Sequence, residues 1–262
     1  MSSNLGLRVL AGMVFLPVLF FLVDAGGWAY RSLVALTIVF GAWEWSGLRR
    51  RLAGVDRIWL MLGALGVGAG ASGLVALTPL LGLYAAATLL LLLRHGDGGT
   101  AARAGDLLAG LLYVGLLPAF LIRIRDLPDG REALLLTYGA VFVCDSAAYG
   151  VGRAIGRHAL WARVSPKKTW EGAIGGLVGA MAAAVVARYW VAPFLSLPAA
   201  LGFGALVGSL GQVGDLIESQ WKREAGVKDS SQIIPGHGGV LDRFDNLHFV
   251  APILYTYLAL CI

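Results

Sequence analysis

The sequence has few charged residues and almost no cysteine. Only 14% of its 262 residues are charged, against about 25% in a typical soluble domain, while 58% are hydrophobic. This scarcity of charge excludes an ordinary soluble protein. It also leaves no basic, aromatic-rich soluble segment that would bind nucleic acid. The two cysteines, Cys144 and Cys261, lie in separate apolar runs, so we expect neither a disulfide framework nor a cysteine metal site.

Long apolar runs are what the chain does contain. About 20 apolar residues suffice for a helix to cross a bilayer, and no soluble segment remains between the runs. We therefore expect an all-α integral membrane protein, a bundle of about nine transmembrane helices in a single polytopic domain. In that domain, 1–130 would be mainly scaffold and 131–262 the catalytic half. The predicted spans are 7–24, 29–47, 58–77, 79–93, 107–122, 132–152, 170–190, 197–220 and 247–262.

The distribution of basic residues predicts the orientation. With a cytoplasmic N-terminus, most of the 21 Lys and Arg lie on the cytoplasmic side, which is the usual bias. The two basic loops, 153–169 and 221–246, then face the cytoplasm. A net charge of +5 suits a face that meets anionic lipids and an anionic substrate. The first span faintly resembles a cleaved signal peptide, but with eight further spans we favour a retained helix.

Charge returns in one block near the C-terminus, residues 219–245. The block holds three Asp, two Lys, two Arg, one His and a cluster of three glycines. Charge within a membrane protein is costly and marks function, and this inventory suits a metal ion and a polyphosphate. The block reads Ser219-x2-Lys222-Arg223-x4-Lys228-Asp229, then Pro235-Gly236-His237-Gly238-Gly239-x2-Asp242-Arg243-x-Asp245.

Helical spacing places the acids of this region on defined faces. In the span 197–220 and just beyond it, three glycines and three polar residues recur every three or four residues and share one face. We expect the glycine end to pack against a glycine stripe in 170–190, and the polar end, with Glu218 beside it, to form a site. The face comprises Gly204, Gly208, Gly211, Asp215, Ser219 and Lys222, and the stripe Gly172, Gly175, Gly176 and Gly179.

The following helix carries a second acidic face, formed by Asp242, Asp245 and Asn246. Asp215 and Asp242 can therefore converge on one cation. Oxygen ligands without a Cys or His cluster favour Mg²⁺ over zinc. The glycine turn before this helix would expose N–H donors to a phosphate.

Two further polar features extend the candidate site. In Ser165-Pro166-Lys167-Lys168-Thr169, either hydroxyl can cap the next helix, and the two lysines at its N-terminus would form an anion site. The alternative is that these lysines only fix topology. Asp145 interrupts an apolar run, so we expect it to face the bundle interior with a partner, in the site or as a structural contact.

His237 is expected to donate a hydrogen bond to a phosphate or near the metal, in preference to acting as a base. A phosphate monoester has a second pKa of about 6 and is already largely dianionic at neutral pH.

The charged block and the Ser-Pro-Lys-Lys-Thr segment resemble the signature of the phosphatidate cytidylyltransferases, and the resemblance covers roughly 140–250. It implies a homodimeric enzyme of the bacterial inner membrane that makes CDP-diacylglycerol and pyrophosphate from CTP and phosphatidic acid. It implies Mg²⁺ bound by Asp215 and Asp242, and leaves a second, monovalent cation open. Asn246 departs from the family pattern, where a small hydroxyl residue is expected.

The resemblance and the residues together define two groups of expected site residues. Catalytic roles are expected for Asp215, Asp242, Lys222, Arg223, Lys228, Asp229 and His237. Substrate contacts are expected for Ser219, Lys167, Lys168, Asp145, Arg243, Gly238, Gly239 and Asp245.

Two other functions remain open at this stage. A CTP-using polyprenol kinase would transfer the γ-phosphate and release CDP, whereas cytidylyl transfer releases pyrophosphate. A transporter would use Asp145, Asp215 and the basic loops as an ion path, but no inverted repeat supports it. The motif of the enzymes that consume CDP-diacylglycerol, Asp-Gly-x2-Ala-Arg-x8-Gly-x3-Asp-x3-Asp, is absent from the sequence.

Overall fold

The structure is a computed structural model that describes residues 3–52, 54–93, 99–234, 236 and 238–262. Its helices form nine continuous rods within these residues, in the order predicted. The single-element rods are α1 (Ser3–Ala25), α2 (Gly27–Leu48), α3 (Val55–Ala71), α4 (Leu77–Leu93), α7 (Gly130–Ile155), α8 (Trp170–Trp190) and α11 (Leu241–Cys261). The other two are α5 (Thr100–Gly110), η1 (Leu111–Leu116) and α6 (Leu117–Arg125), and α9 (Leu197–Leu206), η2 (Val207–Gly211) and α10 (Gln212–Glu224).

The all-α class is confirmed. Among the described residues, four helices are long and apolar enough to cross a membrane, at Thr100–Arg125, Gly130–Ile155, Trp170–Trp190 and Leu197–Glu224. Large apolar side chains such as Phe21 and Trp190 are exposed on the outside of the bundle, as expected for surfaces in contact with lipid. The total of nine spans stays a prediction.

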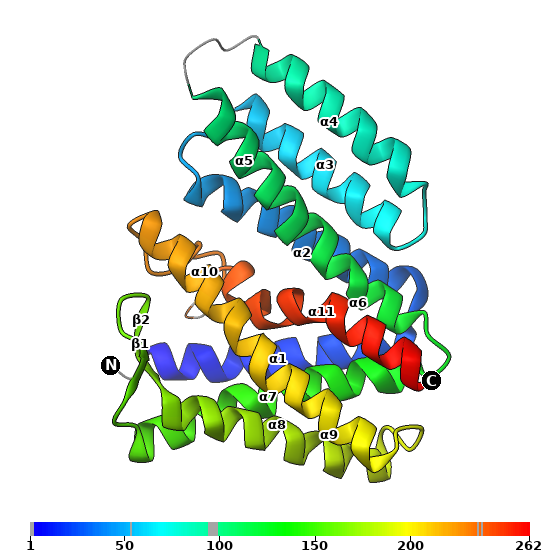
Figure 1. Cartoon of the computed structure of the whole chain (residues 1–262), viewed down its shortest axis with the longest axis vertical. Helices are drawn as coiled ribbons and strands as arrows, with labels where there is room; N and C mark the ends of the chain where they lie inside the picture. Colours follow the sequence, from blue (N-terminus) through cyan, green and yellow to red (C-terminus); the bar gives the residue numbers. More distant parts are fainter. Residues whose placement is uncertain (1–2, 53, 94–98, 235, 237) are drawn as a thin grey trace.

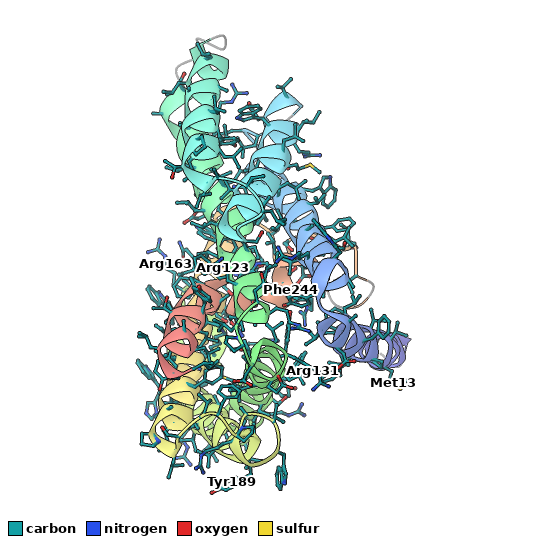
Figure 2. All side chains as sticks on the ribbon, turned by 90° about the vertical axis from the view of Figure 1, so that its right-hand side faces the viewer. Met13, Arg123, Arg131, Arg163, Tyr189 and Phe244 are labelled. Carbon is teal, nitrogen blue, oxygen red and sulfur yellow. The ribbon has the colours of Figure 1, made fainter. Side chains whose placement is uncertain are left out.

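The helices form two groups with α11 between them (Figure 1). In that view α3, α4 and α5 lie at one end of the molecule and α7, α8 and α9 at the other. Figure 2 shows α1, on which Met13 is labelled, projecting from one side, and Tyr189 of α8 at the opposite end from α4. α11 packs against α6, α9 and α10, so it has neighbours from both halves of the chain.

A small hairpin replaces the loop expected before α8. Its strands, β1 (Ala159–Trp161) and β2 (Ser165–Thr169), are antiparallel. Thr169 then caps α8, because its hydroxyl oxygen accepts a hydrogen bond from Gly172 N at 3.1 Å. Of the two capping residues considered from the sequence, the structure selects Thr169.

The predicted glycine-to-glycine packing is wrong in its details. Gly208 does face α8, but a Cβ there would lie 2.6 Å from Leu177 Cα, outside the α8 glycine stripe. That stripe faces α7 instead, where a Cβ on Gly175 would lie 2.7 Å from Val151 Cβ. Gly204 shows the same pattern, because a Cβ there would lie against Met181 Cα, also outside the stripe.

Beyond η2, the rod turns its small residues toward α11. A Cβ on Gly214 would lie 2.6 Å from Phe249 Cβ and 2.9 Å from Asp245 O. Only glycine allows this close approach, as in small-residue helix contacts in membranes. The contact brings the acidic residues of α10 and α11 to a common site.

Candidate active site

A polar pocket of about 310 Å³ lies where α7, α10, α11 and the α10–α11 connection meet. It joins five aspartates, four basic residues, a serine and an asparagine. Ten residues predicted for the site from the sequence line it, which places acids and bases from distant segments together. The lining comprises Asp145, Asp215, Ser219, Lys222, Arg223, Lys228, Asp229, Asp242, Arg243, Asp245 and Asn246.

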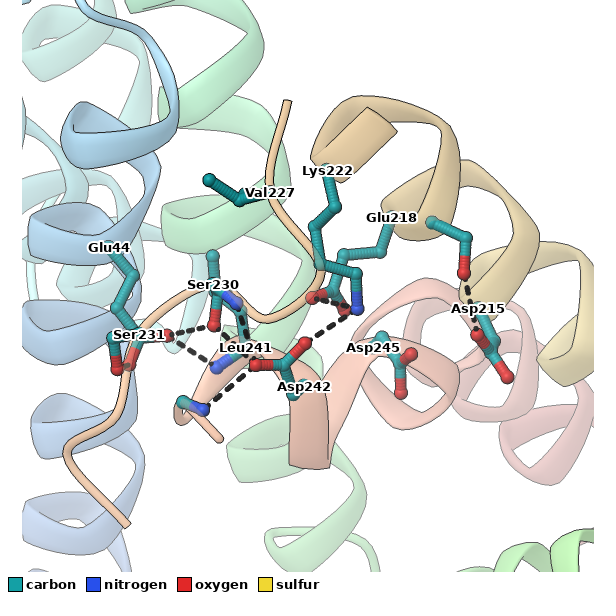
Figure 3. Close-up of polar contacts among 12 residues, drawn as sticks. Glu44, Asp215, Glu218, Lys222, Val227, Ser230, Ser231, Leu241, Asp242 and Asp245 are labelled. Atoms are coloured by element: carbon teal, nitrogen blue, oxygen red, sulfur yellow. Dashed lines mark hydrogen bonds and ion pairs between the residues drawn. The ribbon is translucent and has the colours of Figure 1, made fainter. Parts of the chain in front are cut away.

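Lys222 is the central base of α10. Its Nζ lies 2.6 Å from Asp242 Oδ1 and 3.2 Å from Glu218 Oε1 (Figure 3). Glu218 is fully buried and Lys222 nearly so. Burying a charge is costly unless it is paired, and this single ammonium group pairs with two carboxylates.

Asp215 is paired in a similar way. Its Oδ2 forms an ion pair with Lys168 of β2, and its Oδ1 accepts a hydrogen bond from Ser219 Oγ at 3.3 Å. Successive side chains of a strand point to opposite sides. Lys168 therefore reaches Asp215, while its neighbour Lys167 is exposed and does not line the pocket. Neither lysine is among the residues that line the pocket, so a shared anion site stays a prediction.

Asp242 accepts hydrogen bonds at both oxygens. Besides Lys222 at Oδ1, three donors meet Oδ2 at 2.8 Å each, namely Ser230 N, Ser230 Oγ and Gly239 N. Asp242 lies in the first turn of α11, ahead of the predicted span 247–262. Burial alone would raise the pKa of its carboxyl, but Lys222 and the backbone donors hold that pKa below its ordinary value. The carboxylate is therefore ionised at neutral pH.

The glycine turn donates a hydrogen bond to Asp242. The N–H of Gly239, expected to face a phosphate, donates instead to Asp242. Gly238 has a φ of 83°, which favours glycine, and this conformation lets the turn fold over the carboxylate. His237, between these glycines in the sequence block, lies outside the described residues.

Asp145 and Asn246 connect α7 to α11. Asn246 Nδ2 donates to Asp145 Oδ1 at 2.7 Å, so Asp145 has the partner expected for an acid in an apolar span, and it is exposed toward the pocket. Asn246 Oδ1 is buried and accepts no hydrogen bond from the described residues. Asp245 Oδ1 accepts from Asn246 N at 2.8 Å.

Glu44 of α2 is a residue of this region that the sequence reasoning missed. It lies 1% exposed inside a predicted scaffold span and accepts hydrogen bonds from the α10–α11 connection. The signal that pointed to Asp145, a carboxylate within an apolar run, applies equally to Glu44.

The sequence model of the cytidylyltransferase family matches residues 6–261. The chain belongs to the cytidylyltransferase family. A phosphatidate cytidylyltransferase of Synechocystis sp. is 30% identical to it over 296 aligned positions, which cover 97% of this chain and 96% of the relative. Phosphatidate cytidylyltransferases of Staphylococcus haemolyticus and Staphylococcus aureus are 42% and 41% identical over 147 positions, 56% of this chain and 56% of each relative.

The pocket of this cytidylyltransferase has the donor chemistry for a hard cation. Carboxylate oxygens and the unpaired amide oxygen of Asn246 suit Mg²⁺ better than a metal that prefers sulfur or imidazole. In the described part of the chain, however, no three or more acidic, His or Cys side chains already converge as a ligand set. Lys168 and Lys222 instead neutralise Asp215 and Asp242.

Proposed function

We propose that this cytidylyltransferase transfers the cytidylyl group of CTP to phosphatidic acid, forming CDP-diacylglycerol and pyrophosphate for phospholipid synthesis. One observation carries the proposal: a single pocket, at the meeting of apolar helices, combines five aspartates with four Lys and Arg residues. Such a pocket suits a polyphosphate whose reaction partner is a lipid. The name and near-complete alignment of the Synechocystis relative support the choice of phosphatidic acid.

The reaction needs little covalent help from the protein. An oxygen of the lipid phosphate forms a bond to the α-phosphorus of CTP. The bond from that phosphorus to the bridging oxygen breaks, and pyrophosphate leaves with the electron pair. The attacking phosphate is already largely dianionic at neutral pH, so no base is required. Phosphoryl-type transfers depend on positioning and charge stabilisation.

The basic residues of the pocket are proposed to supply that stabilisation. Lys222, Arg223, Lys228 and Arg243 line the same pocket as the aspartates. Their charges would offset those of the CTP phosphates and of the departing pyrophosphate. Ser219 donates its single hydroxyl hydrogen to Asp215, and it would donate to a phosphate oxygen only in place of that bond.

Asp215 and Asp242 are proposed to hold Mg²⁺, with the other pocket aspartates and Asn246 as neighbouring oxygen donors. When bound, such an ion neutralises phosphate charge and polarises phosphoryl oxygens. Lys168 and Lys222, which now pair with these acids, would then be available to phosphate oxygens. A second, monovalent cation stays a prediction.

The enzyme is proposed to lie in the bacterial inner membrane, with its N-terminus and pocket on the cytoplasmic side. Arg223 Nε donates to Val164 O at 3.3 Å, and Lys168 pairs with Asp215. The first contact joins the two most basic loops, 153–169 and 221–246, and the second joins 153–169 to the α10 helix that leads into 221–246. Both contacts support a common side for the two loops. A homodimer stays a prediction from the family resemblance.

The test is a product assay with purified protein in detergent. CTP labelled in the cytosine ring and phosphatidic acid are incubated with and without Mg²⁺, and the lipid is extracted. We expect ring label in the lipid fraction only when both substrates and Mg²⁺ are present. Release of CDP without labelled lipid would identify a kinase. Substrate flux into vesicles without CTP would identify a transporter.

A further inference from the structure

Glu44 has a buried carboxylate with four hydrogen-bond donors. Its Oε1 accepts from Ser231 Oγ at 2.6 Å and Val240 N at 2.8 Å. Its Oε2 accepts from Leu241 N at 2.8 Å and Ser230 Oγ at 3.0 Å. A buried carboxylate is tolerated only when its oxygens are satisfied in this way, and Figure 3 shows Ser230, Ser231 and Leu241 near it.

The four donors come from the α10–α11 connection and the start of α11, between 186 and 197 residues from Glu44 in the sequence. The first N–H groups of a helix lack intrahelical partners, and the helix dipole favours a negative charge there. Val240, the residue before α11, provides no side-chain cap. Glu44 therefore caps α11 from another helix.

Two short paths lead from Glu44 to the pocket. Asp242 follows Leu241 directly in the first turn of α11, so fixing the Leu241 N–H also fixes the backbone of Asp242. Ser230 provides the second path, because its N–H and hydroxyl both lie 2.8 Å from Asp242 Oδ2. A hydroxyl has one hydrogen, so Ser230 Oγ donates to Glu44 or to Asp242 at a given moment.

The same part of α2 also holds α10. Trp45, fully buried, packs edge-to-face on Trp221 with 4.7 Å between ring centroids. One turn further on, Arg49 Nη1 pairs with Glu224 Oε2 at 3.2 Å. α2 thus contacts α10 and α11, the helices that carry Asp215 and Asp242.

We propose that Glu44 is a positioning residue of the enzyme: by capping α11 and tethering Ser230 and Ser231, it fixes the carboxylate of Asp242 in the pocket. The proposal rests on the function proposed above. It assigns a role in that function to α2, a helix that is far from the charged C-terminal block in the sequence but contacts it in the fold. Glu44 itself contacts no substrate.

The decisive variant is Glu44→Gln, which keeps the side-chain size. In either orientation its NH₂ group faces the N–H of Val240 or Leu241, and two donors cannot pair. We expect kcat to fall by at least about tenfold, or about 1.4 kcal/mol, with a smaller change in the KM for CTP. Glu44→Asp restores a carboxylate one methylene shorter and should recover part of the lost kcat.

The matched control is Asp56→Asn. Asp56 is another buried carboxylate, 4% exposed, and its Oδ2 lies 2.7 Å from Arg103 Nη2. Neither residue lines the pocket. This change should lower the thermal stability in detergent as Glu44→Gln does, yet leave kcat within about twofold, because distant sites act independently.

Hydrogen exchange gives a readout that does not need turnover. The amides of 238–245 should exchange faster in Glu44→Gln than in the wild type, and at the wild-type rate in Asp56→Asn. Wild-type kcat and protection in Glu44→Gln, or an equal loss of kcat in Asp56→Asn, would overturn the proposal.

The two hypotheses fail separately. If the wild type forms no CTP-dependent lipid product, the proposed function is refuted. The hydrogen-exchange comparison still tests whether Glu44 holds the start of α11 in place. If Glu44→Gln does not fold, Ser231→Ala replaces it. That change removes one hydrogen bond to Glu44, and we expect a loss of kcat of about threefold; an unchanged kcat together with unchanged exchange would contradict the tether.

Discussion

Replacing Lys222 by methionine should destabilise the protein strongly, because two acids depend on one ammonium group. Lys222 Nζ lies 2.6 Å from Asp242 and 3.2 Å from Glu218, and Glu218 is fully buried. Methionine keeps most of the side-chain volume but removes the charge. Leaving a buried charge unpaired costs about 3–5 kcal/mol, so we expect a large loss of thermal stability in detergent.

The control for this experiment is Lys167→Met. Lys167 is exposed on β2 and lines no part of the pocket, so its removal should change stability by less than about 0.5 kcal/mol. The double change Lys222→Met with Glu218→Gln should recover part of the stability, since the second buried charge is then absent. Melting is followed by tryptophan fluorescence in the same detergent. The reasoning would be refuted if the Lys222→Met protein were as stable as the wild type, or if the double variant were less stable than the Lys222→Met protein.

Three further predictions follow from the pocket and its packing. Asp215→Asn or Asp242→Asn should abolish CDP-diacylglycerol synthesis, assayed by lipid extraction. Membrane fractionation and gel filtration should still show an inserted, folded protein. Near-normal synthesis by either variant would contradict the assignment of these residues as metal ligands. Lys168→Met should lower kcat/KM for CTP by at least about tenfold through loss of its charge near Asp215, and Lys167→Met by less than about threefold; equal effects would contradict the strand geometry. Gly214→Ala should cost about 1–3 kcal/mol by forcing α10 from α11. Gly150→Ala, whose added Cβ meets nothing within 4 Å, should not lower the melting temperature, because alanine favours a helix more than glycine does.

The helices and much of the pocket were predictable because both depend on short-range patterns. Apolar runs predicted nine helices in the correct order, although α11 begins at Leu241, six residues before the predicted span. The three-to-four-residue spacing of Asp215, Ser219 and Lys222 predicted a shared polar face, and all three residues line the pocket.

The features that were missed depend on contacts between distant residues or on local structure. Nothing near Glu44 in the sequence indicates that its donors lie 186 to 197 residues away. Spacing alone also did not show which face of α8 meets the glycines of the next rod, because the α8 glycines pack on α7. The β hairpin orients Lys168 toward Asp215 and Lys167 away from it. Their shared positive charge alone gives no reason to distinguish these two lysines.

The most direct test of the account follows the α-phosphate of CTP. Purified protein is incubated with phosphatidic acid, Mg²⁺ and CTP labelled with ³²P at the α-position, and the lipid and aqueous phases are counted. The account predicts ³²P in the lipid, with one pyrophosphate released for each labelled lipid formed. Label that stays in the aqueous phase as CDP, or lipid that forms without pyrophosphate, would contradict it.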